Sequence, residues 1–266
     1  MKRFVLPAAA LLLAAPAFAQ LAPPNAAGVA MGHVHLNVRD VEAHKKLWVE
    51  QFGATPLSRE GLPGVKVPGM LILFRQQAPS GGSEGTPMDH FGFKIPNLAD
   101  FLARWRAAGY EVQREFKGTE GFPNAYVMGP DHLKLELQED TSLKVRAMAY
   151  HLHYLVADHV KLRHWYAEKF SLVSRKRGEH DTADVPGMNL TFQTPREVPT
   201  IATKGRVIDH IGFEVRNLEA FCRQLEAAGV KFDVAYRKVA NLGLGLAFLT
   251  DASGVYIELT EGLDKY

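Results

Sequence analysis

The sequence repeats itself at an interval close to 120 residues, and this internal repeat constrains the fold more than any other feature. Val67-Pro68-Gly69-Met70 recurs as Val185-Pro186-Gly187-Met188, 118 residues later. Asp89-His90-Phe91-Gly92-Phe93 recurs as Asp209-His210-Ile211-Gly212-Phe213 at an offset of 120. Because this drift in offset requires only short loop insertions, we expect the two halves of the chain to share one architecture.

Two histidines and one glutamate recur in register with these motifs. They are His33, His90 and Glu136 in the first half, and His151, His210 and Glu258 in the second. Two histidines and a carboxylate form a minimal protein ligand set for a catalytic divalent metal, and they leave coordination positions open. A single strand histidine is more often structural, but six residues that recur in order favour metal binding. His35 and His153 share a strand face with His33 and His151 and remain alternative ligands or substrate contacts.

Four similar units follow one another along the chain. Each begins with a short strand that runs from a histidine to an expected helix N-cap seven residues later. The histidines and caps are His33 and Asp40, His90 and Asn97, His151 and Asp158, and His210 and Asn217. Asp and Asn are favoured caps because their side-chain oxygens accept unpaired backbone N–H groups. An amphipathic helix and about three strands come next, so the pattern predicts an α+β fold of four βαβββ units. Residues 31–140 and 147–263 are the two expected domains.

The N-terminus resembles a secretory signal peptide over residues 1–19. Lys2 and Arg3 precede an apolar run, and Ala17-Phe18-Ala19 forms a typical cleavage site. The run is too short to span a bilayer comfortably, and no second membrane segment is visible. We therefore expect a periplasmic or secreted protein that has no membrane association after cleavage. Residues 20–30 are expected to form a flexible lead-in.

Composition excludes several classes of partner and site. Cleavage would remove two of the 31 Lys and Arg residues and leave basic residues balanced against the 29 Asp and Glu. No basic stripe with interleaved aromatic residues is present, so the sequence gives no reason to expect a nucleic-acid partner. The single cysteine, Cys222, excludes an intrachain disulfide and a thiolate cluster. Four units can complete two pairs within one chain, which makes a monomer feasible and leaves a homodimer open.

The four units, each with a histidine in its first strand, resemble the vicinal oxygen chelate superfamily over residues 32–262. This superfamily includes glyoxalase I, extradiol dioxygenases, and fosfomycin-resistance and bleomycin-binding proteins. The resemblance implies two glyoxalase/bleomycin-resistance/dioxygenase-like domains with cupped mixed sheets, each surrounding one divalent metal ion. It further implies that one site contains His151, His210 and Glu258, and the other His33, His90 and Glu136. Zn, Mn and Fe(II) all suit imidazole and carboxylate ligands.

The resemblance implies an enzyme that binds the adjacent oxygens of a small substrate, with dioxygenase-like or glyoxalase-like lyase or isomerase chemistry. Glyoxalase I-like members usually add a glutamate ligand from the closing strand of a first unit, but residues 71–75 and 189–193 contain no carboxylate. Tyr126 lies ten residues before Glu136, where extradiol dioxygenases have a tyrosine. Tyr126 is therefore a candidate catalytic residue, with a core aromatic as the alternative, while Phe248 replaces it in the second half. A non-catalytic small-molecule binding protein, similar to bleomycin-resistance proteins, is the alternative function.

Overall fold

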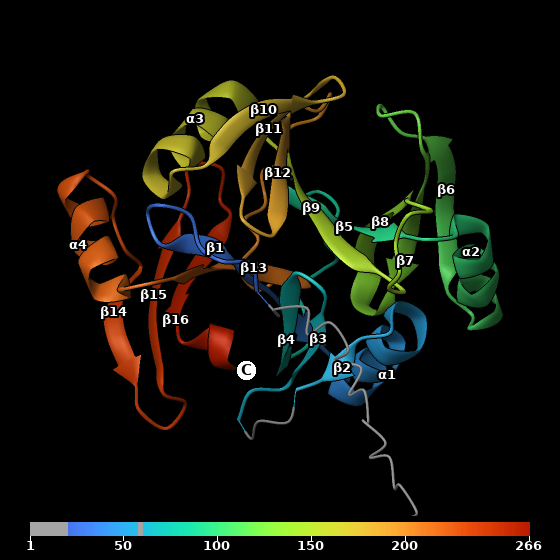
Figure 1. Ribbon diagram of the computed structural model, residues 1–266, viewed down its shortest axis with the longest axis horizontal. Coiled ribbons are helices and arrows are strands. Elements are labelled where there is room, and N and C mark those ends of the chain that lie inside the picture. The colour runs from blue at the N-terminus through green and yellow to red at the C-terminus, as the bar shows by residue number, and fades with distance from the viewer. Residues whose placement is uncertain (1–20, 58–60) are drawn as a thin grey trace, which may run out of the picture.

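The structure is a computed structural model that describes residues 21–57 and 61–266. The expected signal peptide, residues 1–19, lies outside the described residues. The predicted order of one strand, one helix and three strands occurs four times along the chain (Figure 1). Within the two described ranges, no helix is long and apolar enough to cross a membrane.

The four units have the following elements. The first comprises β1 (Val29–Val38), α1 (Val41–Phe52), β2 (Thr55–Pro56), β3 (Gly64–Val67) and β4 (Met70–Gln76). The second comprises β5 (Met88–Ile95), α2 (Leu98–Ala107), β6 (Glu111–Lys117), β7 (Pro123–Gly129), the short 3-10 helix η1 (Pro130–His132) and β8 (Leu133–Glu139). The third comprises β9 (Met148–Leu155), α3 (His159–Phe170), β10 (Val173–Arg177), β11 (His180–Val185) and β12 (Met188–Gln193). The fourth comprises β13 (Ile208–Val215), α4 (Leu218–Ala227), β14 (Val234–Val239), β15 (Leu244–Thr250), β16 (Tyr256–Glu261) and the 3-10 helix η2 (Leu263–Lys265).

Three of the four predicted N-caps are confirmed. The side chains of Asp40, Asn97 and Asp158 accept hydrogen bonds from backbone N–H groups in the first turn of α1, α2 and α3. Asn217 differs because its backbone is left-handed, with φ at 58°, and its side chain makes no capping bond. The Glu261 carboxylate instead accepts from the backbone N–H groups of Asn217 and Leu218.

Each of the two eight-stranded mixed sheets combines one unit from each half of the chain. The first sheet has the order β14-β15-β16-β13-β1-β4-β3-β2, and the second has the order β10-β11-β12-β9-β5-β8-β7-β6. The first and fourth units meet where β1 pairs antiparallel with β13, and the second and third meet where β5 pairs antiparallel with β9. The ranges 31–140 and 147–263 therefore each contribute strands to both sheets. We call these two strand pairs the seams of the sheets.

Two helices pack across consecutive units, which belong to different sheets. Trp48 of α1 packs against Phe91 of β5, with ring centroids 6.0 Å apart. Phe170 of α3 packs against Phe213 of β13 at 4.9 Å. Each of these helices thus contacts the sheet to which its own unit does not belong, and the two sheets share one apolar core. Figure 1 shows the other two helices, α2 and α4, at opposite ends of the molecule.

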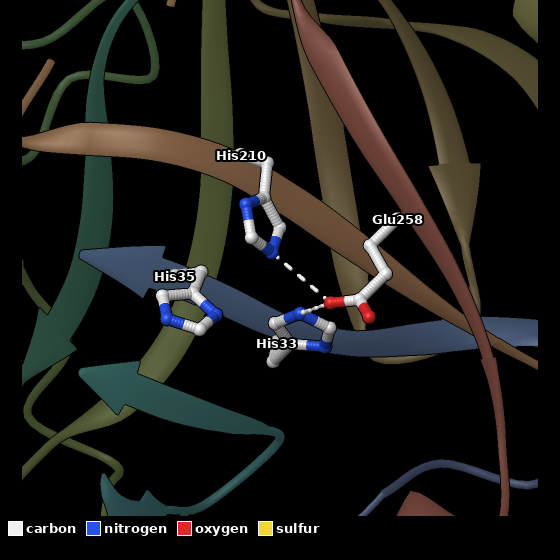
Figure 2. A group of neighbouring side chains, drawn as sticks. All are labelled: His33, His35, His210 and Glu258. Carbon is white, nitrogen blue, oxygen red and sulfur yellow. Dashed lines mark hydrogen bonds and ion pairs between the residues drawn. The ribbon is translucent and has the colours of Figure 1, made fainter. Parts of the chain in front are cut away.

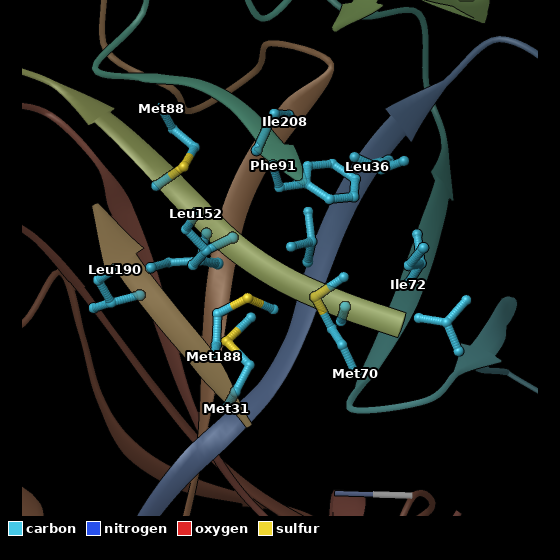
Figure 3. Close-up of a cluster of buried hydrophobic side chains, with 14 of the residues drawn as sticks. Met31, Leu36, Met70, Ile72, Met88, Phe91, Leu152, Met188, Leu190 and Ile208 are labelled. Carbon is cyan, nitrogen blue, oxygen red and sulfur yellow. The ribbon is translucent and has the colours of Figure 1, made fainter. Parts of the chain in front are cut away.

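The repeated Val-Pro-Gly-Met tetrads join the two sheets as well as forming turns. The Pro68 carbonyl accepts a hydrogen bond from the Ala149 N–H in the other sheet at 3.0 Å, and the Pro186 carbonyl accepts from Met31 at 2.9 Å. Gly69 and Gly187, the third residues of the tetrads, have positive φ values of 95° and 90° that favour glycine. Figure 3 shows the methionines of both tetrads in the core with side chains from strands of both sheets. Each tetrad therefore forms a local turn and also contributes contacts between the two sheets.

The segment expected to be a flexible lead-in is packed against the domain. Leu21 is buried in an apolar cluster. The Asn25 side-chain amide donates to the carbonyls of Phe170 and Ser171, at 2.9 and 3.0 Å. These carbonyls lie at the C-terminal end of α3, where backbone acceptors lack helical partners. Asn25 supplies the missing donors and orders the segment before β1, so the prediction of flexibility is wrong.

Candidate metal centres

The first candidate centre lies at the seam between β1 and β13. It consists of His33 and His35 on β1, His210 on β13 and Glu258 on β16, whose ligand atoms all lie within 4.8 Å of one another (Figure 2). Oε2 of Glu258 is 2.9 Å from Nε2 of His33 and 3.0 Å from Nε2 of His210. Burial alone would raise the pKa of Glu258, but hydrogen bonds from both histidines outweigh it and hold that pKa well below its usual range.

The second candidate centre repeats this arrangement at the other seam. It consists of His90 on β5, Glu136 on β8, and His151 and His153 on β9. Oε2 of Glu136 is 2.9 Å from Nε2 of His90 and 3.2 Å from Nε2 of His151. All four residues are buried. The six residues singled out in the sequence thus belong to two clusters of the same composition.

The predicted division of these residues between the sites is wrong. His33 lies with His210 and Glu258, and His151 lies with His90 and Glu136, so each centre takes residues from both halves of the chain. The seams explain the exchange, because His35 is directly opposite His210 and His153 is directly opposite His90. The resemblance implied the ligand types, but the antiparallel pairing of β1 with β13 and β5 with β9 determines which copies meet.

Two glycines allow the histidines to cross the seams. A Cβ atom on Gly92 would overlap the imidazole of His151, and one on Gly212 would overlap that of His33. Each glycine is the fourth residue of the repeated Asp-His-x-Gly-Phe motif. The lack of a side chain at each glycine thus makes room for a histidine from the other half of the chain. The two glycines are therefore a sequence feature that could have indicated the pairing.

His210 has a carboxylate at each ring nitrogen. Nδ1 is 2.7 Å from Oδ1 of Asp209, and Nε2 is 3.0 Å from Oε2 of Glu258. Burial lowers the pKa of His210, but the two carboxylates outweigh it and the net shift is upward. A ring between two carboxylates needs either two protons or a cation on one side. Metal-ligating histidines usually donate their second N–H to a carboxylate, so a divalent cation at Nε2 fits this geometry.

His90 has the same environment. Its Nδ1 is 2.7 Å from Asp89, and hydrogen bonding to His90 lowers the pKa of Asp89 to about 2 although burial opposes the shift. Both Asp-His pairs are visible in the sequence, but no pattern there indicates a role for the aspartates. Their other partners differ, because Nζ of Lys134 is 2.9 Å from Asp89 whereas the Asn37 amide donates to Asp209. An aspartate at Nδ1 of the histidine is thus common to both centres. The group that contacts this aspartate differs, because it is the cationic Lys134 at the second centre and the neutral amide of Asn37 at the first.

His35 and His153 provide a further nitrogen donor at each centre. Neither ring nitrogen of His35 has a hydrogen-bond partner among the described residues, although both are buried. Nδ1 of His153 lies 3.1 Å from Nε2 of His90. Burial lowers the pKa of both histidines well below its usual value, which favours the neutral form that binds metals. Each cluster can therefore offer three imidazoles and one carboxylate, a set that suits Zn, Mn or Fe(II).

Tyr126 lies beside the second centre. It is directly opposite Glu136 on the neighbouring strand, and its ring centroid is 5.1 Å from that of His90. Burial and the nearby carboxylates raise its pKa, so the hydroxyl is protonated at neutral pH and can donate a hydrogen bond. At the first centre, the ring of Phe248 takes this position at 5.4 Å from His210.

Leucine side chains cluster in the sheet that contains the first centre. Leu71 and Leu73 of β4 project on the same strand face, and they pack with Leu21, Leu244 and Leu263. Partly buried residues complete this leucine cluster, and they are Leu57, Leu62, Leu242 and Tyr266. The Tyr266 hydroxyl donates to the Leu242 carbonyl, which ties the C-terminus to the β14–β15 turn. An apolar cluster therefore occupies the strand face beside the first centre.

Polar side chains occupy the corresponding positions beside the second centre. At the repeat offset of 118, Asn189 and Thr191 replace Leu71 and Leu73. The buried Arg177 side chain donates to both, at 3.2 and 2.9 Å, and its Nη1 is 2.9 Å from Glu120. The two centres thus have matching ligands in unlike surroundings.

Comparisons with known proteins agree with this fold. Residues 150–259 match the model of the Glyoxalase/Bleomycin resistance protein/Dioxygenase superfamily. Glyoxalase I from Zea mays is similar in structure, with a TM-score of 0.67, 13% identity and coverage of 89% of this chain and 94% of that one. A Bacillus subtilis protein provisionally assigned as a dioxygenase gives a TM-score of 0.65 at 13% identity, over 87% of this chain and 85% of that one. No curated protein matches the sequence. The second half of the chain thus matches the model of this superfamily, which is also known as the vicinal oxygen chelate superfamily, and the whole described chain has the two-domain fold of glyoxalase I.

Proposed function

We propose that the protein is a metal-dependent enzyme that binds a small substrate through two adjacent oxygen atoms. One observation carries the proposal: His90 and His210 each lie between an aspartate at Nδ1 and a glutamate at Nε2. This arrangement supports metal binding by the Nε2 atoms, with the aspartates fixing the orientation and tautomer of the rings. A bound divalent metal would supply Lewis-acid stabilisation of negative charge that develops on a substrate oxygen.

The protein residues would position the substrate and hold its protons. His33 and His151 are fully buried, so their rings are held in place by packing before any ligand binds. The protonated Tyr126 hydroxyl could donate to a substrate oxygen at the second centre. Both dioxygenase and lyase or isomerase chemistry are compatible with this set of groups. His35 and His153 provide the additional donor that the sequence did not place on the closing strands of the first and third units.

Metal content tests the ligand assignment. The wild-type chain, His90→Ala and His210→Ala should be expressed with their N-terminal residues and analysed by plasma mass spectrometry after gel filtration. We expect two metal ions per chain in the wild type and one in each variant, since each substitution removes a ligand from one centre. His164→Ala is the matched control, because His164 is exposed on α3. If the wild type holds no stoichiometric metal and chelation leaves its stability unchanged, the non-catalytic binding protein is the better description.

We further propose that the protein is exported and acts outside the cytoplasm. The support is the charged, apolar and small-residue pattern of residues 1–19. Cell fractionation should find the full chain in the periplasm or medium, shortened at its N-terminus, and a chain that lacks residues 2–19 in the cytoplasm. Retention of the full-length chain in the cytoplasm would contradict export.

A further inference from the structure

A small polar pocket lies between the β6–β7 connection and the β10–β11 turn. Its volume is about 290 Å³, and it is lined by Thr119, His159, Glu179, His180, Asp181, Phe192 and Gln193. This volume is close to the lower end for small-molecule sites, roughly 300 Å³. Six of the seven lining residues have polar side chains. The pocket therefore has the size and lining of a site for a small hydrophilic molecule.

Two lining residues connect this pocket to the second centre. Gln193 hydrogen bonds with Nε2 of His153 at 3.2 Å, while Nδ1 of the same ring faces His90. The ring of His180 is 5.6 Å from that of His153 and meets it edge-on. His153, itself a candidate ligand, thus lies between the pocket and His90, and a molecule in the pocket would lie next to the centre.

The interior beside the second centre extends the polar character of the pocket. Arg177 and Glu120 form an ion pair, so their charges compensate one another. The Tyr150 hydroxyl donates to Glu120 at 2.6 Å, and the Gln138 amide donates to it at 3.1 Å. This surface offers hydrogen bonds without a large net charge. It suits a neutral molecule that is rich in oxygen atoms better than an apolar ring or a multiply charged anion.

The equivalent region beside the first centre is apolar. At the repeat offset of 118, Leu62 corresponds to His180. Leu62 belongs to the leucine cluster, as do the partly buried Leu57 and Leu242. Leu263 and Tyr266 add the C-terminus to the same cluster. Polar groups at the second centre are therefore replaced by close-packed leucines at the first.

We propose that the second centre is the substrate site, that its substrate is a small, neutral, oxygen-rich molecule, and that the leucine cluster makes the surroundings of the first centre too apolar to bind such molecules. The inference rests on the proposed binding of metal at both centres. It goes further, because two centres with the same candidate ligands are assigned different selectivity. The difference in selectivity follows from the polar pocket at one centre and the leucines at the other. It does not follow from burial, because His35 of the first centre is partly exposed, whereas all four residues of the second centre are buried.

The test uses cobalt(II) as the metal and acetohydroxamic acid as the probe, since this small polar molecule carries two adjacent oxygens. The full chain is loaded with cobalt, and the visible absorption is followed as the probe is added. We expect one probe molecule per chain, in the wild type and in His210→Ala, and none in His90→Ala. Benzohydroxamic acid, which adds an apolar ring, should bind about tenfold more weakly because the pocket is polar and small.

Exchange of single residues between the centres supplies the sharper variants. His180→Leu gives the second centre the residue of the first, and we expect about tenfold weaker probe binding with unchanged cobalt content. Leu73→Thr gives the first centre the residue of the second, Thr191, and should allow a second probe molecule to bind. Circular dichroism and cobalt content confirm that each variant is folded and loaded.

The outcomes separate this inference from the proposed function. If no cobalt binds to the wild type, both proposals fail. If two cobalt ions bind but the probe binds at both centres, at neither, or only at the first, the proposed metal binding stands and the assignment of selectivity is overturned. Equal binding of the two hydroxamates would overturn the substrate class alone.

Discussion

The two candidate centres have the same ligand types at the same strand positions, and yet their surroundings differ in polarity. Beside His33 and His210 the strand faces carry leucines, whereas beside His151 and His90 they carry Arg177 and its polar partners. Each set of candidate ligands would have to fit one small ion, whereas the surroundings would have to fit the rest of a bound molecule. The comparison therefore indicates that duplication preserved the centre and allowed the pockets to diverge.

The largest predicted effect concerns the glycines at the seams. Gly92→Ala should displace His151 and Gly212→Ala should displace His33, because the added methyl group would overlap an imidazole in each case. We expect each variant to lose one metal ion per chain and about 3 kcal/mol of unfolding free energy, as for overpacked cores. Metal analysis and urea unfolding measure the two effects.

Gly129→Ala is the matched control for the glycine variants. Its backbone is extended, and a Cβ atom there would meet only ordinary contacts at 3.7 Å or more. The control should keep both metal ions. Retention of two ions by Gly92→Ala or Gly212→Ala would show that the described approach across the seam is not required for the centres.

The second prediction uses a charge difference between the sheets. Glu214 of β13 occupies the position that Lys94 occupies in β5. Lys94 is paired with Asp140 at 3.0 Å, whereas Glu214 is buried and hydrogen bonds with Thr260 at 2.8 Å. Burial raises the pKa of Glu214 from 4.5 to about 7. The folded protein therefore holds this proton more tightly than the unfolded chain does.

The sign of the resulting pH dependence is fixed by that upward shift. The contribution of the tightly held Glu214 proton to the free energy of unfolding is fully present below pH 4.5 and is lost as the pH rises through about 7. We expect Glu214→Gln to become more stable relative to the wild type by up to about 3 kcal/mol between pH 4.5 and pH 8. Urea unfolding of both proteins across this range measures the difference. A difference that is constant with pH would show that Glu214 ionises as an ordinary carboxyl group.

The third prediction tests the carboxylates behind the ligands. Asp89→Asn and Asp209→Asn keep the side-chain shape but remove the charge that faces Nδ1 of His90 and His210. We expect a loss of about 10-fold to 100-fold in metal affinity at the affected centre, as for other residues that orient metal-bound histidines. Competition with a chelator of known affinity measures it. Asp100→Asn is a control, because this exposed residue of α2 hydrogen bonds with the Asn97 side chain and belongs to neither cluster. Equal affinity in all three variants would contradict the role assigned to the aspartates.

The local structure was predictable from the sequence because it depends on residues that are close in the chain. Asp40, Asn97 and Asp158 mark helix starts, and the histidines mark the first strands, so four βαβββ units could be inferred and are confirmed. Asn217 was misjudged because Glu261, which is distant in sequence, supplies the cap of α4.

The grouping of the ligands was not predictable in the same way. The pairing of repeated strands depends on the free energy of long-range packing. In a repeated sequence, equivalent strands occur in both halves, so the local pattern does not distinguish the possible partners. Gly92 and Gly212 indicate the correct pairing, because each leaves space for a histidine from the other half of the chain. This space is apparent only once the strand pairing is known. The leucine cluster and the Arg177 network were missed because their members come from several strands, turns and the C-terminus, which are distant in sequence and share no single periodic pattern.

The smallest predicted effect concerns the aromatic residue beside each centre. Tyr126→Phe should leave metal content and stability unchanged, because the ring remains next to His90 and only the hydroxyl is lost. If Tyr126 donates to a bound oxygen ligand, binding of acetohydroxamic acid should weaken about fivefold, since one hydrogen bond contributes about 1 kcal/mol. Phe248→Tyr places the same hydroxyl beside His210, and it should not bring probe binding to the first centre as long as the leucine cluster is intact. If Tyr126→Phe binds the probe as tightly as the wild type, Tyr126 is a packing residue, and the difference between the two centres then rests on the polar pocket and the leucines rather than on the hydroxyl.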